Sequence, residues 1–472
     1  MQQIEEFRAA SERILAWIEQ YFRTIENYPV KSQVSPGDIF DLLPDKAPES
    51  ADALDSVLGD LDKVIMPGIT HWQHPGFFAY FNANNSFPSI LGELVTAALG
   101  AQCMIWDTSP SGAELEEKMM EWMKSAMRLP GNWHGVIQDT ASTATLCALL
   151  TAREMKSGFR VNESGFSGLP VMTVYCSTEA HSSIEKAVKI AGIGRSNLRK
   201  IGVDEAFAMK PDQLERAIEE DIKAGYVPLM AVAAAGTTGS LAMDPLADIG
   251  RICGKYGLWY HIDAAYAGNA AILPEYRLMF DGLEMADSYV FNPHKWMFTN
   301  FDCSMYFVRD REALVHTFEI SPEYLSSDAV QVNNYRDWGI QLGRRFRALK
   351  LWFVLRLYGL EGIREKFRLH IALAQYFRDQ LQKHGSFEIM APVSLNLVCF
   401  RYMPEGELPG EEIDVLNTRL LRAINAGGRA YISHTRLNGR YVLRASIGQT
   451  NVERRHIDVL LDELIRCIQL IV

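Results

Sequence analysis

PLMAVAAAGTTGSLAMDPLADIGRICGKYGLWYHIDAA, residues 228–265, places two apolar runs on either side of an amphipathic stretch. The runs are PLMAVAAAG and LWYHIDAA, whereas PLADIGRICGKYG between them spaces its apolar residues as a helix does. The same alternation occurs earlier, in VMTVYCS followed by HSSIEKAVKIAG, and again later with SYVFNP. Strands that alternate with helices predict an α/β fold with a mainly parallel sheet, over about residues 135–304.

Helical segments flank this central region. Apolar residues recur at three- and four-residue steps from Leu15 to Ile25 and again from Leu54 to Ile65, which predicts two amphipathic helices. Two helices and a proline-containing loop make a poor independent core. We therefore expect this N-terminal segment to pack on the rest of the chain or on a partner subunit.

A long helical stretch follows Trp338, and the pattern beyond Phe387 mixes strands with a closing helix. The sequence thus predicts three parts. They are an N-terminal helical dimerisation segment (1–80), a large cofactor-binding α/β domain (81–352) and a smaller C-terminal α+β domain (353–472).

Composition and charge exclude several classes of protein. The 472 residues carry a net charge of −11, and an acidic surface repels phosphate backbones, so we expect no nucleic-acid partner. The seven cysteines lie far apart without a CxxC pair, which favours reduced core thiols in a cytoplasmic protein and no metal site. No apolar run is long enough for a membrane span, and the acidic start MQQIEEFRAASE does not look like a signal peptide.

Asp263 ends the apolar run that begins at Leu258, and small residues follow it at Ala264, Ala265, Ala267 and Gly268. A carboxylate at a strand end serves as a magnesium ligand in a nucleotide site, or simply as a hydrogen-bonded turn residue. The magnesium interpretation needs a glycine-rich phosphate loop ending in Lys-Ser or Lys-Thr, which the sequence lacks. The neighbouring alanines favour a flat ring lying close to the backbone.

Lys295 lies among aromatic residues in FNPHKWMFTNFDCS, residues 291–304. It follows the predicted strand SYVFN, one α/β unit beyond Asp263, so both side chains can reach the same edge of the sheet. On its own, Lys295 is better explained as a lysine whose stem covers apolar surface while its amine stays in water.

Three other stretches each have an ordinary and a functional interpretation. DTASTATL, from Asp139, opens a helix with small and hydroxyl residues, either as a plain N-cap or as a phosphate site. His181 begins a predicted helix, either incidentally or as a ring that stacks on a planar ligand. Gly236–Ser240, GTTGS, is a strand-to-loop turn that also places hydroxyl groups at the strand end.

The order of these features favours pyridoxal phosphate (PLP) as the cofactor. Its phosphate needs a helix N-terminus, its ring nitrogen needs a carboxylate, and its aldehyde needs a lysine amine for a Schiff base. The sequence supplies a helix start, a stacking histidine, a threonine turn, a strand-end aspartate and a lysine.

THWQHPGFFAYF, IQDTASTATL, AHSSIEKA, HIDAAYAG, FNPHKW, NFDCS and LGRRFRALKLW together resemble the group II PLP-dependent decarboxylases. The similarity is greatest to the aromatic L-amino-acid decarboxylases, which act on tryptophan, tyrosine or DOPA, and extends from about residue 7 to the C-terminus. The resemblance implies a fold type I homodimer whose N-terminal helices wrap on the partner subunit.

The resemblance also implies roles for individual residues. It makes Lys295 the Schiff-base lysine, Asp263 the partner of the ring nitrogen, and His181 the ring that stacks on the cofactor. It implies that Tyr324, in a mobile loop, protonates the carbanion, whereas aldehyde-forming relatives carry phenylalanine there. Further residues that the resemblance places at the cofactor are Ala141, Ser142, Thr238, Ala265, Asn292 and His294.

The expected substrate pocket is aromatic. The resemblance assigns to it Trp72, Tyr80, Phe81, Ala83 and Gly343, although core packing alone also explains some of the aromatic residues. Glycine at 343 leaves room for a bicyclic ring, which favours tryptophan or 5-hydroxytryptophan over DOPA, tyrosine or phenylalanine.

Two residues depart from the family pattern, and both concern the substrate. Asn82 stands where the family usually has proline, and Ala83 where some members have threonine near the substrate. The expected reaction is decarboxylation of an aromatic L-amino acid to the arylalkylamine and CO2. The alternatives are a decarboxylase of another amino acid, such as glutamate or histidine, an aromatic aldehyde synthase, and, from other classes, a nucleotide-binding or structural protein.

Overall fold

The computed structural model describes residues 2–320 and 332–471. The chain divides into two compact units. One unit combines Met1–Asn82 with His370–Val472, and the other is Ala83–Leu369. The three-part domain division expected from the sequence stays a prediction, and in this description its first and last parts fall mostly within one unit.

The unit Ala83–Leu369 is built on a seven-stranded sheet with the order β1-β7-β6-β5-β4-β2-β3. Its strands are β1 (His134–Gln138), β2 (Met172–Ser177), β3 (Leu198–Ile201), β4 (Val227–Ala234), β5 (Trp259–Asp263), β6 (Ser288–Phe291) and β7 (Ser304–Val308). β7 runs antiparallel to both β1 and β6, whereas the pairs from β6 to β3 are all parallel. The predicted α/β fold with a mainly parallel sheet is confirmed.

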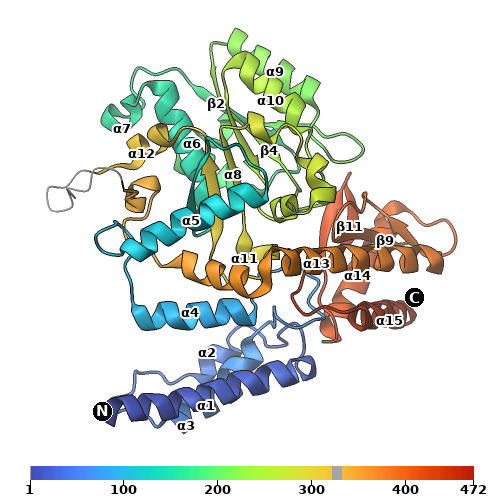
Figure 1. The fold of residues 1–472 in the computed structure, drawn as a ribbon. Coiled ribbons are helices and arrows are strands. Elements are labelled where there is room, and N and C mark those ends of the chain that lie inside the picture. The colour runs from blue at the N-terminus through green and yellow to red at the C-terminus, as the bar shows by residue number, and fades with distance from the viewer. Residues whose placement is uncertain (1, 321–331, 472) are drawn as a thin grey trace. The chain divides into compact units, whose positions relative to one another are not determined.

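Helices cover the sheet because each parallel connection needs a crossover (Figure 1). Right-handed crossovers from β2 to β3 and from β4 to β5 progress in opposite directions along the sheet, so their helices lie on opposite faces. α8 (Ser182–Ile190) packs on α6 (Ala141–Ser157), and α10 (Leu246–Tyr256) packs on α9 (Pro211–Lys223).

The remaining helices of this unit lie outside those crossovers. They are α4 (Phe87–Leu99), α5 (Pro110–Ala126), α7 (Arg160–Ser164), α11 (Pro293–Trp296) and α12 (Arg311–Phe318). α5 packs beside β1, and α12 packs against α6. A buried core of aliphatic side chains from both the strands and α6, including Val174, Val232 and Leu149, holds the layers together.

Five loops, each following a strand, lie along one edge of the sheet. Because β1, β2, β4, β5 and β6 are mutually parallel, their carboxyl ends lie along the same edge. Open α/β sheets bind their ligands in the loops that follow such strand ends. The loops that contain residues 139–142, 178–181, 235–240, 264–268 and 292–295 all begin here.

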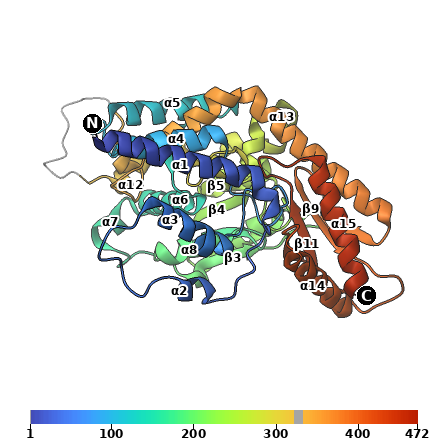
Figure 2. The same cartoon turned by 90° about the horizontal axis from the view of Figure 1, so that it is seen from below.

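The other unit contains a four-stranded antiparallel sheet with the order β10-β11-β9-β8. The strands are β8 (Phe387–Ile389), β9 (Leu397–Tyr402), β10 (Ser433–Leu437) and β11 (Arg440–Ser446). α14 (Gly410–Ala426) packs on β9, β11 and α15 (Arg454–Ile471), as Figure 2 shows. The strands and closing helix predicted after Phe387 are confirmed.

The N-terminal segment supplies α1 (Gln2–Thr24), α2 (Asp38–Leu42) and α3 (Leu54–Asp60). The second predicted helix ends earlier than expected: a π-helical turn, Leu61–Ile65, follows α3, and Pro67 then prevents a regular continuation. The long helix predicted after Trp338 is α13 (Arg347–His384), which is interrupted at Gly359, where φ is 66°. Among the described residues, no helix is both long and apolar enough to cross a membrane.

Candidate cofactor and substrate site

Lys295 lies in the short helix α11, which begins directly after β6. The side chain is partly buried, and burial lowers the pKa of its ammonium group, an effect that the Asp263 carboxylate opposes. A lowered pKa increases the fraction of neutral amine, which is the nucleophilic form. The structure therefore gives Lys295 surroundings suited to attack on a carbonyl group.

Asp263 is the last residue of β5 and is only 9% exposed. Its Oδ1 atom accepts a hydrogen bond of 3.1 Å from the backbone N–H of Ala265. That bond holds the carboxylate at the strand end and places Ala265 beside it. A buried carboxylate in this position can keep a ring nitrogen protonated.

His181 is the N-cap residue of α8. Its Nδ1 atom lies 2.8 Å from Ser183 Oγ and accepts from the Ser183 N–H, which fixes the orientation of the ring. Desolvation lowers the pKa of His181, although part of the residue stays exposed; Asp263 raises that pKa and Lys295 lowers it. The three side chains are thus close enough to interact electrostatically.

The N-terminus of α6 begins at Ala141, directly after β1. The Thr140 side chain caps the Thr143 N–H at 3.3 Å, while Ala141 and Ser142 occupy the first positions, whose N–H groups have no partner within the helix. Asp139 holds this turn, because its Oδ1 accepts from Thr140 N and its Oδ2 from Gln341 Nε2. An anion fits such a helix start.

Asn292 and His294 are both buried beside Lys295. Ser304 Oγ donates to Asn292 Oδ1 at 2.6 Å, and the Cys303 N–H donates to His294 Nδ1 at 2.9 Å. Burial, together with the neighbouring Lys295 charge, lowers the pKa of His294 to about 3, so the ring is neutral. With Nδ1 as an acceptor, the proton of the neutral imidazole lies on Nε2.

The two threonines of the turn Gly236–Ser240 differ in their exposure to solvent. Thr237 is buried and bonds to Ser240 Oγ and to the Ala242 N–H, so it maintains the turn, whereas Thr238 is exposed. Exposure at the end of β4 leaves the Thr238 side chain accessible to a ligand at this edge.

The residues predicted to contact substrate fall into both units. Trp72 stacks on Phe77 and on Tyr80, with ring centroids 4.4 Å and 5.9 Å apart, respectively. The hydroxyl oxygens of Tyr80 and Tyr431 lie 3.2 Å apart. Phe81 is buried in the same unit and lies under the Arg444 guanidinium. Ala83 and Gly343 belong to the unit that contains Lys295, and Gly343 is exposed. Tyr324 lies outside the described residues.

Two residues with clear structural contacts were not predicted from the sequence. Asn84 is 1% exposed, its Nδ2 donates to the Lys295 carbonyl at 2.7 Å, and its N–H donates to the His294 carbonyl. Tyr431 extends the aromatic group of Trp72 and Tyr80. The signal for Asn84 was a second asparagine in FNAN, two residues after the departure at Asn82.

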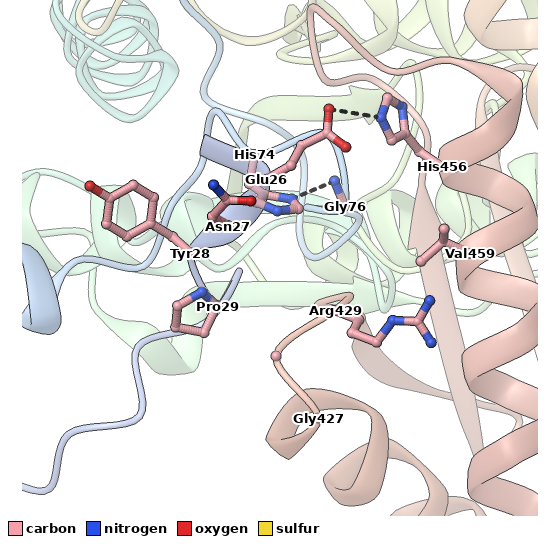
Figure 3. A pocket seen from close by; sticks show the side chains of 11 residues that line it. Glu26, Asn27, Tyr28, Pro29, His74, Gly76, Gly427, Arg429, His456 and Val459 are labelled. Carbon is pink, nitrogen blue, oxygen red and sulfur yellow. Dashed lines mark hydrogen bonds and ion pairs between the residues drawn. The ribbon is translucent and has the colours of Figure 1, made fainter. Parts of the chain in front are cut away.

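A separate cavity of about 470 Å³ lies within the unit Met1–Asn82 with His370–Val472 (Figure 3). Glu26, which lines it, pairs with Arg455 at 2.7 Å and with His456 Nε2 at 3.6 Å. His74, also in its wall, accepts from the Gly76 N–H at 2.8 Å. None of the residues predicted to bind cofactor or substrate lines this cavity.

The sequence matches the pyridoxal-dependent decarboxylase conserved domain over residues 36–403. The chain belongs to this family of decarboxylases. It is 43% identical over 464 residues to a phenylacetaldehyde synthase of Arabidopsis thaliana, covering 96% of this chain and 94% of the relative. It is 42% identical over 464 residues to tyrosine decarboxylase 2 of Narcissus pseudonarcissus, covering 96% and 92%.

Solved structures agree with this assignment to the pyridoxal-dependent decarboxylases. The fold matches the crystal structure of Oryza sativa TDC with PLP and tryptamine at a TM-score of 0.95 and 34% identity, covering 98% of each chain. The protein is therefore a PLP-dependent decarboxylase of the fold type I class.

The residues at the sheet edge fit PLP. A partly buried lysine, a buried strand-end carboxylate and a helix N-terminus provide partners for its aldehyde, ring nitrogen and phosphate, respectively. Among the described residues, there is no cluster of three or more His, Cys, Asp or Glu side chains that suits a metal ion.

Proposed function

We propose that this enzyme removes the α-carboxylate of an aromatic L-amino acid and releases the arylalkylamine and CO2. The observation that carries the proposal is the mutual electrostatic reach of Lys295, Asp263 and His181 at the carboxyl edge of the sheet. The relatives named for tyrosine decarboxylation and the structure with tryptamine support an aromatic substrate.

PLP, when bound, supplies an electron sink for the pair of electrons left by the departing carboxylate. Asp263 holds the negative charge that keeps a proton on the ring nitrogen, and Lys295 Nζ provides the amine for covalent attachment. His181 stacks on the ring, and its neutral imidazole can pass a proton through water. Tyr324 returns a proton to Cα.

Six further residues complete the cofactor site in this proposal. The first N–H groups of α6, at Ala141 and Ser142, bind the phosphate together with His294, while Asn292 supports them. Thr238 and Ala265 lie beside the ring. Trp72, Tyr80, Phe81 and Ala83 are the residues proposed to contact the substrate.

Gly343 favours tryptophan or 5-hydroxytryptophan as the substrate, ahead of DOPA, tyrosine and phenylalanine. Gly343 is exposed, and a Cβ atom there would lie 3.3 Å from Gln102 Nε2. A side chain at this position would therefore narrow the space in front of Gln102, whereas glycine leaves it for a second ring.

Aldehyde synthesis is the second candidate, because a relative with 43% identity is named as a phenylacetaldehyde synthase. Tyr324 argues for decarboxylation, since the resembling aldehyde-forming enzymes carry phenylalanine there. A decarboxylase of glutamate or histidine is a further alternative, which the aromatic residues Trp72, Tyr80 and Phe81 disfavour.

One assay separates these possibilities. The purified enzyme with PLP is supplied with tryptophan, 5-hydroxytryptophan, DOPA, tyrosine, phenylalanine, glutamate and histidine, while amine, aldehyde and hydrogen peroxide are each measured. Amine from the aromatic acids is the expected product, fastest with an indole. Aldehyde with hydrogen peroxide would replace the proposed reaction, and turnover of glutamate alone would replace the substrate class. Lys295→Ala should abolish both turnover and the visible absorbance of bound cofactor.

We also propose that the enzyme is a homodimer. On α4 the small residues Ser89, Gly92 and Thr96 face inward, while large apolar side chains are exposed. The exposed ones, with their exposed fractions, are Phe87 (59%), Leu91 (47%), Leu94 (46%), Val95 (41%) and Leu99 (60%). A helix that turns its large apolar face to solvent needs a partner surface, and a second copy supplies one.

The oligomeric state tests this proposal by light scattering coupled to gel filtration. The wild type should have the mass of two chains, whereas Leu91→Glu together with Leu94→Glu should give single chains. A monomeric wild type would contradict the proposal.

A cytoplasmic location is proposed as well, because all seven cysteines are buried and unpaired, as in proteins of reducing compartments.

A further inference from the structure

The loop that follows Lys295 is held by charged side chains from two helices. Glu93, on α4, accepts a hydrogen bond of 3.4 Å from Asn300 Nδ2 and pairs with Lys350 Nζ, on α13, at 3.1 Å. Arg347, also on α13, donates from Nε to Asp302 Oδ1 at 2.8 Å. Residues 300–302 are therefore tied to both helices by ion pairs and hydrogen bonds.

These charges are buried beside tightly packed backbones. Lys350 is 1% exposed and Arg347 is 5% exposed. A Cβ atom on Gly92 would lie 2.7 Å from Lys350 Cα, so glycine is required where α4 meets α13. Burial lowers the pKa of Lys350 to about 8, and the nearby Cys303 and Asp302 partly offset this effect. A buried charge is retained at such a cost only where partners surround it.

The same loop determines how the imidazole of His294 is held. Cys303 bonds to His294 twice, through its N–H to Nδ1 at 2.9 Å and through its carbonyl to the His294 N–H at 3.2 Å. The next residue, Ser304, donates a hydrogen bond from its hydroxyl to Asn292 Oδ1 at 2.6 Å. Displacement of residues 300–303 would move the Cys303 N–H donor that fixes the orientation of the His294 ring and of its Nε2–H.

We propose that Lys350 is a positioning residue: with Glu93 and Arg347 it holds residues 300–303 so that the Nε2–H of His294 is directed at the phosphate of PLP. This inference rests on the proposed role of His294 as a phosphate ligand. Lys350 does not itself contact the cofactor in this proposal, but it controls the affinity for the phosphate of PLP.

The test compares the binding of PLP with that of pyridoxal, which lacks the phosphate, to the apoenzyme by absorbance titration. Lys350→Met should weaken PLP binding about tenfold and leave the affinity for pyridoxal within about twofold. Lys350→Arg should restore most of the PLP affinity. Lys383→Met, an exposed lysine on the same helix, is the matched control and should bind both compounds as the wild type does.

A double-mutant cycle with His294→Gln separates the phosphate role of His294 from the positioning role of Lys350. If His294→Gln itself leaves PLP affinity unchanged, the phosphate role of His294 fails. If His294→Gln weakens PLP binding but its effect multiplies with that of Lys350→Met, the lysine does not act through the histidine, and the positioning role is overturned. Equal loss of PLP and pyridoxal binding in Lys350→Met also overturns it. The expected result is that the double variant binds PLP no more weakly than the weaker single variant.

Discussion

Asn84 Nδ2 donates a 2.7 Å hydrogen bond to the main-chain oxygen of Lys295, across 211 residues of sequence. The Asn84 N–H makes a second bond to the carbonyl of His294. The turn that contains Lys295, the proposed Schiff-base lysine, is therefore held by a residue distant in the sequence. We expect Asn84 to affect cofactor attachment through this backbone contact.

Replacement of Asn84 by alanine should loosen this turn. The partly buried Lys295 carbonyl would lose its side-chain donor, at a cost of about 1–3 kcal/mol. We expect faster loss of PLP during dialysis and a lower urea midpoint, followed by the visible absorbance of bound cofactor and by circular dichroism. Asn451→Ala, at an exposed asparagine, is the control. Wild-type cofactor retention in Asn84→Ala would contradict the role given to this bond.

Removal of Glu116 should destabilise the protein strongly. Glu116 and Arg344 are 1% and 6% exposed and form a bidentate pair at 2.7 and 3.1 Å, and Glu116 also accepts from the Ile137 N–H. Breaking a buried pair leaves an uncompensated charge, so Glu116→Ala should lower the free energy of unfolding by about 3–5 kcal/mol. Urea denaturation measures this value.

Substitution of both partners of this pair provides the control. Glu116→Leu combined with Arg344→Leu leaves no unpaired charge and should recover much of the lost stability. A double variant that is less stable than Glu116→Ala would show that the pair matters for reasons other than charge burial.

Acid should destabilise the fold through its buried histidines. Burial lowers the pKa of His74 to about 4 and that of His261 to about 4, against an ordinary value of 6.5. Because the unfolded chain binds these protons more readily, the stabilisation is complete above pH 6.5. It is lost as the pH falls from there towards 4. Each ring contributes about 3 kcal/mol to this loss.

The urea midpoint, measured at intervals between pH 7.5 and 4.5, checks this expectation. The midpoint should fall across that range in the wild type and fall less in His74→Gln. His384→Gln, at an exposed histidine, should follow the wild type. A wild-type midpoint that does not change with pH would rule out the contribution from buried histidines.

Gly343→Ser should shift substrate preference from indoles to phenols. The added Cβ would lie 3.3 Å from Gln102 Nε2, which leaves less room for a bicyclic ring. We expect the ratio of kcat/KM for tryptophan to kcat/KM for tyrosine to fall about tenfold. Gly343→Ala separates the effect of volume from that of the hydroxyl group. An unchanged ratio in both variants would remove this position from the specificity pocket.

The sequence predicts the parts of the site that follow from periodicity. Alternating strands and helices predicted the sheet edge at which Asp263, His181 and Lys295 meet, because parallel strands end on the same side. The aromatic group around Trp72 was predicted from the composition of that stretch of sequence. Each of these inferences needs only neighbouring residues.

Contacts between distant segments carry no such local pattern. Asn84 and Glu93 lie about 200 residues from the loop that they hold, and nothing in FNAN or in α4 indicates their partners. Lys350 looks like an ordinary helical lysine in LGRRFRALKLW until its burial beside Glu93 is seen. The π-helical turn after α3 likewise depends on packing that periodicity does not report.

The boundary between the two units, at Asn82 and Ala83, has a consequence for diversification of this scaffold. The aromatic residues proposed to contact substrate, Trp72, Tyr80 and Phe81, precede it, and the proposed cofactor residues His181, Asp263 and Lys295 follow it. Substitutions at these three aromatic positions therefore leave the sequence of the unit Ala83–Leu369 unchanged, whereas Ala83 and Gly343 belong to that unit.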